Sequence, residues 1–391
     1  MKYDFDKIIS RRNTNCYKYD SAPYDDTIAM WVADMDFQVA PKIIEALRKR
    51  VEHGIFGYTR VPDSYYESVI RWFERRHNFR MEKDWFIYVP GVVPAVSAII
   101  KAMTSPGDKV LIQTPVYNCF FSSIRNNGCE AECSSLVYDT SGSQPTYRID
   151  FDDFERRCAD PKTKVFLLCN PHNPAGRVWT KEELTKMGEI CLRHDVFVIA
   201  DEIHCELVMP GYEYTPFASL GEDFLMHSAT CSSPSKAFNI AGLQISNITA
   251  KDESVRQKID KAVNINEVCD VNPFGVLALQ AAYDESEDWL MQLIEYLNEN
   301  YIALCRFFEE HLPDFPVCKL EGTYLVWVDI SKTGTESDIL CKEMLAKEHV
   351  WLNDGLMYGE EGKNFVRINI ALPRARMLEG LQRMEKFLKE K

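Results

Sequence analysis

One lysine in the chain stands in a setting that suits covalent chemistry. Lys236 follows Ser233 and Ser235 in a short polar stretch, and apolar runs that read as strands, 224–230 and 244–250, lie on either side. Hydroxyls and backbone N–H groups in such a turn can bind a phosphate. The lysine amine can form a Schiff base with an aldehyde. An amine beside a phosphate site suggests pyridoxal phosphate; a solvated loop lysine is the alternative that this stretch alone leaves open.

Three further polar residues come at the ends of apolar runs or within them. Asn173 follows the run 165–170, Asp201 follows the run 196–200, and Arg367 lies inside the alternating run 365–371. Continuous apolar runs are typical of a buried parallel sheet, whose function lies at the carboxyl ends of its strands. We therefore expect Asn173, Asp201 and Lys236 on one rim of a sheet. A turn aspartate and a solvated strand arginine remain the structural alternatives.

A metal site is the competing interpretation of the same region. Asp201 and Glu202 are followed closely by His204, and carboxylates and imidazoles are common metal ligands. No second histidine and no cysteine pair stands at ligand spacing, so we do not expect a metal.

Seven motifs in order carry a resemblance to a known family. They span residues 31–37, 57–59, 114–117, 170–176, 201–204, 233–236 and 367–373, nearly the whole chain. The chain resembles the fold-type I pyridoxal-phosphate family, the class I/II aminotransferases, and within it the cystathionine β-lyase, or C–S lyase, branch. The resemblance implies an α/β fold: a large domain with a mostly parallel seven-stranded sheet flanked by helices, plus a smaller α+β domain.

The resemblance also implies roles for residues around pyridoxal phosphate. Lys236 would bind the aldehyde and act as the base at Cα, Asp201 would face the pyridine nitrogen, and Tyr117 would stack on the ring. The remaining cofactor contacts expected are from Asn173 and His204 to the phenolic oxygen, and from Ser233, Ser235, Val92, Val93 and Tyr58 to the phosphate.

On the substrate side, the resemblance implies that Arg367 binds the α-carboxylate with two parallel N–H bonds. Asn173, Ala33 and Tyr58 would complete the substrate contacts, and Tyr58 would come from the neighbouring subunit of a homodimer. The active sites would therefore lie at a subunit interface.

Three positions depart from the family pattern. His204 stands where many aminotransferases carry a tyrosine to the phenolic oxygen. Gln244 replaces a frequent phosphate-binding arginine, and Val93 replaces a hydroxyl residue. The phosphate would then depend more on backbone donors and on the dipole of the helix that follows Gly91.

The activity implied is a C–S β-lyase that converts cystathionine or related S-substituted cysteines to pyruvate, ammonia and a thiol. An aminotransferase with the same residues is the first alternative. A non-catalytic regulator that uses the fold as a binding module is the second.

Composition restricts the partners. The chain has 391 residues and a net charge of −14, which argues against nucleic acid or an anionic membrane as the main partner. Thirteen cysteines occur without a CxxC pair, and residues 1–10 lack an apolar core, so we expect reduced thiols and a cytoplasmic location. No apolar stretch approaches the roughly 20 residues that a membrane span needs.

The pattern of elements predicts two domains. We expect residues 1–50 to join a small domain formed by 288–391, and residues 51–287 to form the large domain. Helices are predicted from Pro41 to Gly54, from a cap at Asp63 or Ser64, from Gly91 to about Met103, after a Thr180–Glu183 capping box, and over 288–311. Residues 164–200 read as strand, helix, strand, and 126–144 as a polar surface excursion.

Overall fold

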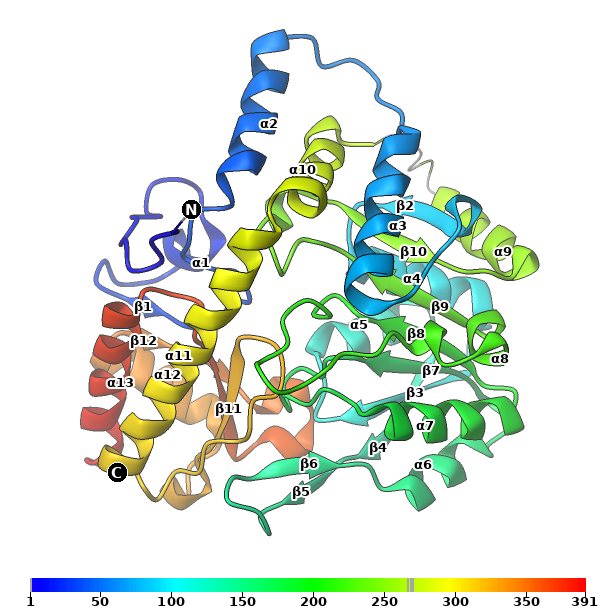
Figure 1. Ribbon diagram of the computed structural model, residues 1–391. Coiled ribbons are helices and arrows are strands. Elements are labelled where there is room, and N and C mark those ends of the chain that lie inside the picture. Colours follow the sequence, from blue (N-terminus) through cyan, green and yellow to red (C-terminus); the bar gives the residue numbers. More distant parts are fainter. Residues whose placement is uncertain (1, 266, 268–270) are drawn as a thin grey trace.

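The large lobe is built around one twisted sheet (Figure 1). The structure, a computed structural model, describes residues 2–265, 267 and 271–391. Within these residues the main sheet has seven strands in the order β2-β10-β9-β8-β7-β3-β4. Their bounds are β2 (Phe86–Val89), β3 (Lys109–Thr114), β4 (Glu130–Ser135), β7 (Thr163–Cys169), β8 (Phe197–Asp201), β9 (Ser228–Ser232) and β10 (Ser246–Thr249). Among them β10 alone runs opposite to the other strands, which confirms the expected mostly parallel sheet.

Both faces of this sheet are buried, which explains its continuous apolar runs. Along β7, Val165 and Leu167 join one apolar cluster, whereas Phe166 and Leu168 join another on the opposite face. The first face is covered by α4 (Val92–Met103), α5 (Asn118–Asn126) and α9 (Glu253–Asn264), and the second by α6 (Phe151–Cys158) and α7 (Lys181–Arg193). The predicted unit of strand, helix and strand is confirmed, because β7 and β8 pair in parallel on either side of α7.

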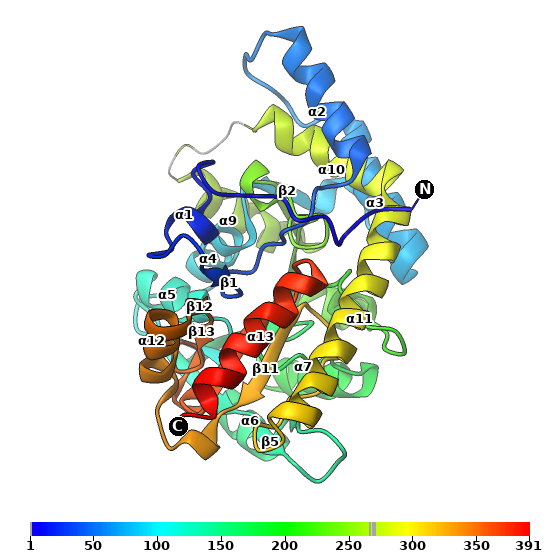
Figure 2. The same cartoon turned by 90° about the vertical axis from the view of Figure 1, so that its left-hand side faces the viewer.

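The smaller lobe combines short strands with helices. Its antiparallel sheet has the order β11-β14-β13, formed by β11 (Leu325–Asp329), β14 (Phe365–Asn369) and β13 (Asn353–Asp354). The helices α12 (Ser337–Glu348) and α13 (Arg374–Leu388) pack here, and α13 lies beside α11 (Glu287–His311) (Figure 2). In the N-terminal segment, β1 (Ile28–Ala29) pairs in parallel with β12 (Val350–Trp351) of this lobe.

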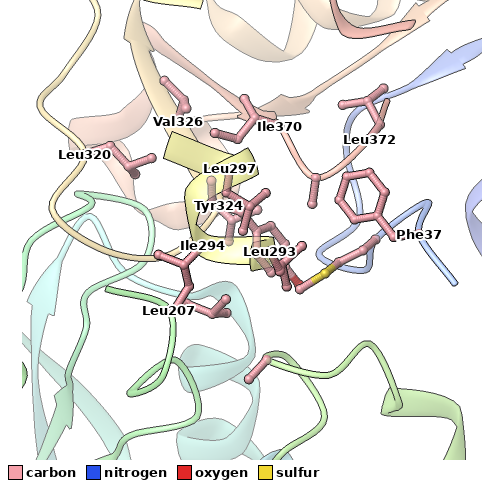
Figure 3. Close-up of a cluster of buried hydrophobic side chains, with 14 of the residues drawn as sticks. Phe37, Leu207, Leu293, Ile294, Leu297, Leu320, Tyr324, Val326, Ile370 and Leu372 are labelled. Carbon is pink, nitrogen blue, oxygen red and sulfur yellow. The ribbon is translucent and has the colours of Figure 1, made fainter. Parts of the chain in front are cut away.

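The long helix α11 runs between the two lobes (Figure 1), and the predicted helix over 288–311 is confirmed. Its residues Leu293 and Leu297 lie in one buried cluster with Tyr324 of the small lobe, Phe37 of the N-terminal segment and Leu207 of the large lobe (Figure 3). We propose that the small domain comprises 1–50 and 288–391 and the large domain 51–287. The strand pairing of β1 with β12 and the strands of the main sheet at 86–249 support this division.

The polar segment 126–144, expected as a surface excursion, lies at the edge of the sheet and contains regular strands. Residues 130–135 form β4, which pairs in parallel with β3 along its whole length, and β5 (Val137–Asp139) forms a hairpin with β6 (Thr146–Arg148). Among the described residues, the edge strand β4 pairs with β3 alone and exposes part of its surface, so its sequence is polar. Apolar periodicity therefore gives no sign of it.

Two other local predictions need correction. Helix α3 (Asp63–His77) starts after Pro62, and neither Asp63 nor Ser64 caps it. The apolar residues 224–226 lie in α8 (Glu222–Met226), and the strand begins only at Ser228. A short apolar run cannot distinguish a helix from a buried strand, which is why the second boundary was misplaced. Among the described residues, no helix combines the length and the apolar character that a membrane crossing needs.

The capping box at the start of α7 supplies a stability prediction. The Thr180 hydroxyl accepts a hydrogen bond from the Glu183 amide at 3.2 Å, and the Glu183 carboxylate accepts one from the Thr180 amide at 2.9 Å. Thr180→Ala should lower the free energy of unfolding by about 1 kcal/mol, measured by urea denaturation. Thr185→Ala is the control: its hydroxyl only bonds back to the Lys181 carbonyl within the helix, so it should cost little. An equal loss in both variants would contradict the capping role.

Candidate active site

A cavity of about 210 Å³ lies at the carboxyl ends of β7, β8 and β9. This is the edge at which the sequence predicts function for a parallel sheet. The wall of the cavity combines residues from the N-terminal segment and the large lobe. The residues that line it are Ala33, Pro90, Gly91, Val92, Val93, Pro94, Tyr117, Cys169, Asn173, Asp201, Ile203, His204, Ser235, Lys236, Ala241 and Ile245.

Lys236 reaches the cavity from the turn that follows β9. Its Nζ donates a hydrogen bond to the Ala33 carbonyl oxygen at 2.7 Å. Burial, together with the positive charge of Arg367, lowers the pKa of Lys236 to about 8, against the opposing charges of Asp34 and Asp201. The neutral amine, which a nucleophile or a base requires, is therefore far more abundant near neutral pH than for a lysine with an ordinary pKa.

Asp201 ends β8 and is only 5% exposed. Its Oδ1 accepts a hydrogen bond from the Ile203 amide at 3.2 Å. Burial raises the pKa of Asp201 to about 7, and the nearby Lys236 charge opposes the rise. A buried carboxyl with so little compensation suits a cationic partner, such as the protonated nitrogen of a pyridine ring.

The start of α4 gives the cavity an anion-binding corner. Gly91 precedes the helix, and Val92 and Val93 are its first residues; no side chain in the described part of the chain caps it. The first N–H groups of a helix lack intrahelical partners, and they carry the positive end of its dipole. Ser235 lies in the same cavity wall.

Ser233 is placed differently from the expectation. Its hydroxyl donates to the Ile245 carbonyl at 2.6 Å and accepts from the Ser235 amide at 3.1 Å. A hydroxyl has one proton, so none is left for a phosphate. In this arrangement Ser233 fixes the turn that carries Lys236, and its expected phosphate contact stays a prediction.

Tyr117 and Asn173 form another part of the wall. Tyr117 precedes α5 and offers a flat ring to the cavity; burial raises the pKa of its phenol, which therefore stays neutral. Asn173 is buried, and its Oδ1 accepts a hydrogen bond from Arg367 Nη1 at 3.1 Å.

Arg367 contacts the lining residue Asn173 but is not itself one of the residues that line the cavity. Its Nη2 donates to the Trp31 carbonyl at 2.8 Å, and its buried Nε has no hydrogen-bond partner among the described residues. The guanidinium is thus oriented by two contacts but still has an unused N–H bond. A planar fork with a free N–H bond suits the carboxylate of an amino acid.

His204 is buried and lines the cavity. Burial lowers the pKa of His204 well below its usual value, so the imidazole is neutral, and its Nδ1 has no partner among the described residues. Glu202 does not join it: the Glu202 carboxylate accepts hydrogen bonds from the Tyr214 hydroxyl and the Phe217 amide. Within the described chain, Asp201, Glu202 and His204 do not form a cluster of potential metal ligands.

Tyr58 is the one expected site residue that lies far out on the surface. It is 95% exposed, in the loop that follows α2 (Pro41–His53), and it is not part of the cavity wall. Its contact with a cofactor or a substrate stays a prediction that requires a second chain.

Several residues of the site were not anticipated from sequence. Asn369 donates from its Nδ2 to the Val32 carbonyl at 2.6 Å and to the Asp34 carbonyl at 2.7 Å. Tyr324 donates to the Ala33 carbonyl at 2.9 Å. Arg367 and Asn369 are two residues apart on one strand and so share a face, a spacing that could have indicated a paired role.

The buried carboxyl supplies a pH prediction for the cofactor-free protein. The pKa of Asp201 in the folded state is about 7, above its ordinary value of 3.8. Between these values the folded state binds more protons than the unfolded state, so stability falls as pH rises from about 4 to about 7. Asp201→Asn should remove this fall and stabilise the cofactor-free protein at pH 8 by roughly 2 to 4 kcal/mol, measured by urea denaturation across pH.

Asp139 provides the control for that experiment. A hydrogen bond from the Ser141 side chain, with help from the Arg148 guanidinium, lowers the pKa of Asp139 to about 2. Its contribution therefore has the opposite sign, and Asp139→Asn should not stabilise the protein at pH 8. An unchanged pH slope in Asp201→Asn would contradict the raised pKa.

The fold and the site together define a class of protein. A match to the family of class I and II aminotransferases extends over residues 25–384, and the chain belongs to this family. It is 40% identical to cystathionine beta-lyase PatB of Bacillus subtilis (strain 168) over 389 residues, 98% of this chain and 100% of that protein.

Two solved structures are similar over the full length. Cystalysin from Treponema denticola, which contains a pyridoxal 5'-phosphate cofactor, has 36% sequence identity and a TM-score of 0.96, with 100% of both chains covered. The pyridoxal-phosphate-bound C–S lyase from Staphylococcus hominis has 36% identity and a TM-score of 0.92, covering 99% of this chain and 98% of that one. The resemblance to the C–S lyase branch is confirmed.

Proposed function

We propose that the protein is a pyridoxal-phosphate-dependent C–S β-lyase that converts cystathionine or a related S-substituted cysteine to pyruvate, ammonia and a thiol. The observation that carries the proposal is the pair of buried titratable groups, Lys236 and Asp201, that line one cavity at the carboxyl ends of the strands. The similarity to PatB supports the lyase assignment over the full chain.

The donors around the cavity fit pyridoxal phosphate. Lys236 would hold its aldehyde, and Asp201 its ring nitrogen. The start of α4, with Ser235, would hold its phosphate. Tyr117 would cover one ring face, and Asn173 and His204 would lie near the phenolic oxygen. When bound, pyridoxal phosphate supplies an electron sink for the charge that develops on Cα.

The chain's own residues would then position the substrate and move its proton. Arg367 binds the α-carboxylate with its free Nε–H bond, and Asn173 keeps the guanidinium in place. The Lys236 amine, partly neutral because its pKa is lowered, accepts the Cα proton. Asp201 stays ionised when a cation faces it and so keeps the ring nitrogen protonated.

An aminotransferase is the second candidate, favoured by the family to which the chain belongs. The purified protein should be given L-cystathionine with pyridoxal phosphate and no added keto acid, while pyruvate and free thiol are followed. Equal amounts of pyruvate and thiol support the lyase. Turnover that strictly requires an added keto acid supports the aminotransferase and overturns the proposal.

We also propose that the protein is a homodimer whose sites include Tyr58 of the partner subunit, and that it is cytoplasmic. Helix α2 projects from the body of the protein (Figure 1), and the loop after it exposes Ile55 and Phe56 together with Tyr58. A partner subunit would cover these apolar groups. The twelve cysteines in the described part of the chain are free, which suits a reducing compartment.

A complementation experiment tests the shared site. Lys236→Ala and Tyr58→Ala homodimers should each have low activity, but mixed dimers should regain activity, because one of their two sites then carries both residues. Subunits are exchanged by mild denaturation and dilution, and sedimentation gives the oligomeric state. A fully active monomer, or mixtures no more active than the separate variants, would contradict the shared site.

A further inference from the structure

One carbonyl oxygen in the cavity wall receives two hydrogen bonds. The Ala33 oxygen accepts from Lys236 Nζ at 2.7 Å and from the Tyr324 hydroxyl at 2.9 Å. A carbonyl oxygen has two lone pairs, so it can accept both donors at once. Each donor withdraws negative charge from the shared oxygen, and each therefore weakens the bond that the other makes.

The Ala33 carbonyl cannot turn away from these donors, because the strip 31–35 is fixed on both sides of it. Arg367 donates to the Trp31 carbonyl, and Asn369 donates to those of Val32 and Asp34. Further along, the Met35 carbonyl accepts from Asn239 Nδ2 at 3.0 Å. The strip is a rigid backbone wall whose carbonyl directions are set by side chains of β14 and of the turn after Lys236.

Tyr324, the second donor to the Ala33 carbonyl, is also held firmly in place. It is fully buried just before β11, and its ring lies in the apolar cluster that includes Leu293 and Leu297 of α11 (Figure 3). The preceding residue, Thr323, holds a left-handed backbone with φ of 72°, and its amide donates to the Leu207 carbonyl at 2.6 Å. Tyr324 is not part of the cavity lining, so it acts through Ala33 rather than by touching a substrate.

We propose that Tyr324 is a positioning residue for Lys236: the Ala33 carbonyl is the resting site of the free lysine amine, and the Tyr324 hydroxyl weakens that carbonyl as an acceptor. A weaker acceptor stabilises the ammonium form less, so more of the amine is available to accept a proton. The inference rests on the proposed function in one respect, the use of Lys236 in catalysis.

Other groups also act on the charge of Lys236. Asp34 lies in the wall strip, Asp201 on β8, Arg367 on β14 and Cys119 on α5, and their charges affect the pKa of Lys236. Tyr117 and neutral His204 share the cavity. None of these groups is altered by Tyr324→Phe, which removes a single hydroxyl and keeps the ring that packs on α11.

The test begins with the cofactor-free protein. The rate at which trinitrobenzenesulfonate labels Lys236 is measured by peptide mass spectrometry from pH 6 to 10, with exposed Lys42 as the internal standard. In Tyr324→Phe the midpoint for Lys236 should move upward by about half a unit to one unit, the size expected for one altered hydrogen bond. An unchanged midpoint, or a downward shift, overturns the proposal.

Tyr301→Phe is the matched control. Tyr301 is also a buried tyrosine; its hydroxyl donates to the Cys318 carbonyl at 3.2 Å and accepts from the Leu320 amide at 3.1 Å, away from Ala33. Its loss should leave the midpoint for Lys236 in place. A shift equal to that of Tyr324→Phe would show a general effect of losing a buried hydroxyl and would overturn the specific role.

The loaded enzyme gives a second readout. The acidic limb of the pH profile of kcat should move upward in Tyr324→Phe, while KM changes little because Arg367 is untouched. If Lys236 were not the catalytic lysine, this limb would stay in place while labelling of the cofactor-free protein still shifted. The two arms therefore separate a failure of the proposed function from a failure of the role of Tyr324.

Discussion

Lys236→Ala is expected to abolish formation of pyruvate from L-cystathionine, with a loss of at least about a thousandfold in kcat. The variant should also lack the visible absorption of lysine-bound cofactor after incubation with pyridoxal phosphate. Within the described residues, Lys236 is the sole lysine that lines the cavity, and burial has already lowered its pKa to about 8. No other amine in that wall can replace it as the attachment point or as the base.

Borohydride reduction of the wild type identifies the attachment point directly. The reduced cofactor should be found on the peptide that contains Lys236, by mass spectrometry. Lys251→Ala is the control: Lys251 pairs with Glu222 at 2.6 Å on the surface, and its loss should change neither the spectrum nor the activity. A cofactor found on another lysine, or full activity in Lys236→Ala, would show that Lys236 is neither the attachment point nor the base.

Arg367→Ala is expected to raise KM for the amino-acid substrate by about a hundredfold, the size of a charged hydrogen bond worth roughly 2 to 3 kcal/mol. The arginine is held by the Trp31 carbonyl and by Asn173, and its Nε is left for a carboxylate. Arg367→Lys keeps the charge but loses the planar fork, so its KM should be intermediate. Steady-state kinetics of pyruvate release give both constants.

Loss of Arg367 also removes a contact to the wall strip, so a purely structural effect must be separated from loss of the carboxylate contact. A pair of substrates does this: S-methylcysteine and its α-carboxamide, which lacks the negative charge. The wild type should strongly prefer S-methylcysteine, which carries the carboxylate. Arg367→Ala should show little preference, because without the guanidinium the carboxylate and the carboxamide bind about equally well. A preference that persists unchanged in the variant would remove Arg367 from the carboxylate role.

The sequence carried enough information to place Lys236, Asp201 and Asn173 at one rim. Asn173 and Asp201 follow apolar runs that are buried on both faces, Lys236 follows the buried strand β9, and parallel strands end on the same edge. The family resemblance added the atoms of pyridoxal phosphate that these residues would contact, and it indicated the C–S lyase branch. The edge strand β4 was missed because its exposed side needs no apolar residues, and only its pairing with β3 defines it.

The contacts of the wall strip could not be predicted, because they are made by backbone carbonyls. Any residue at position 33 has a carbonyl, so the types of side chain in 31–35 do not indicate that Lys236, Tyr324, Arg367 and Asn369 converge there. The direction of the Ser233 hydroxyl could not be predicted for a related reason: its type suits a phosphate, but in the folded chain it donates its only proton to the Ile245 carbonyl. In both cases the outcome depends on the direction of a backbone group in the folded chain.

The hydrogen bond between Arg367 and the Trp31 carbonyl joins residues 336 positions apart, and the bond between Asn369 and Val32 does the same for their neighbours. During translation, the strip 31–35 leaves the ribosome long before β14 has been made. A nascent chain that already contains Lys236 still lacks Arg367 and Asn369, the residues whose hydrogen bonds order the strip 31–35. A complete cofactor pocket therefore forms only after β14 has been synthesised. Depletion of vitamin B6, the precursor of pyridoxal phosphate, should then affect maturation of the finished chain rather than its early folding.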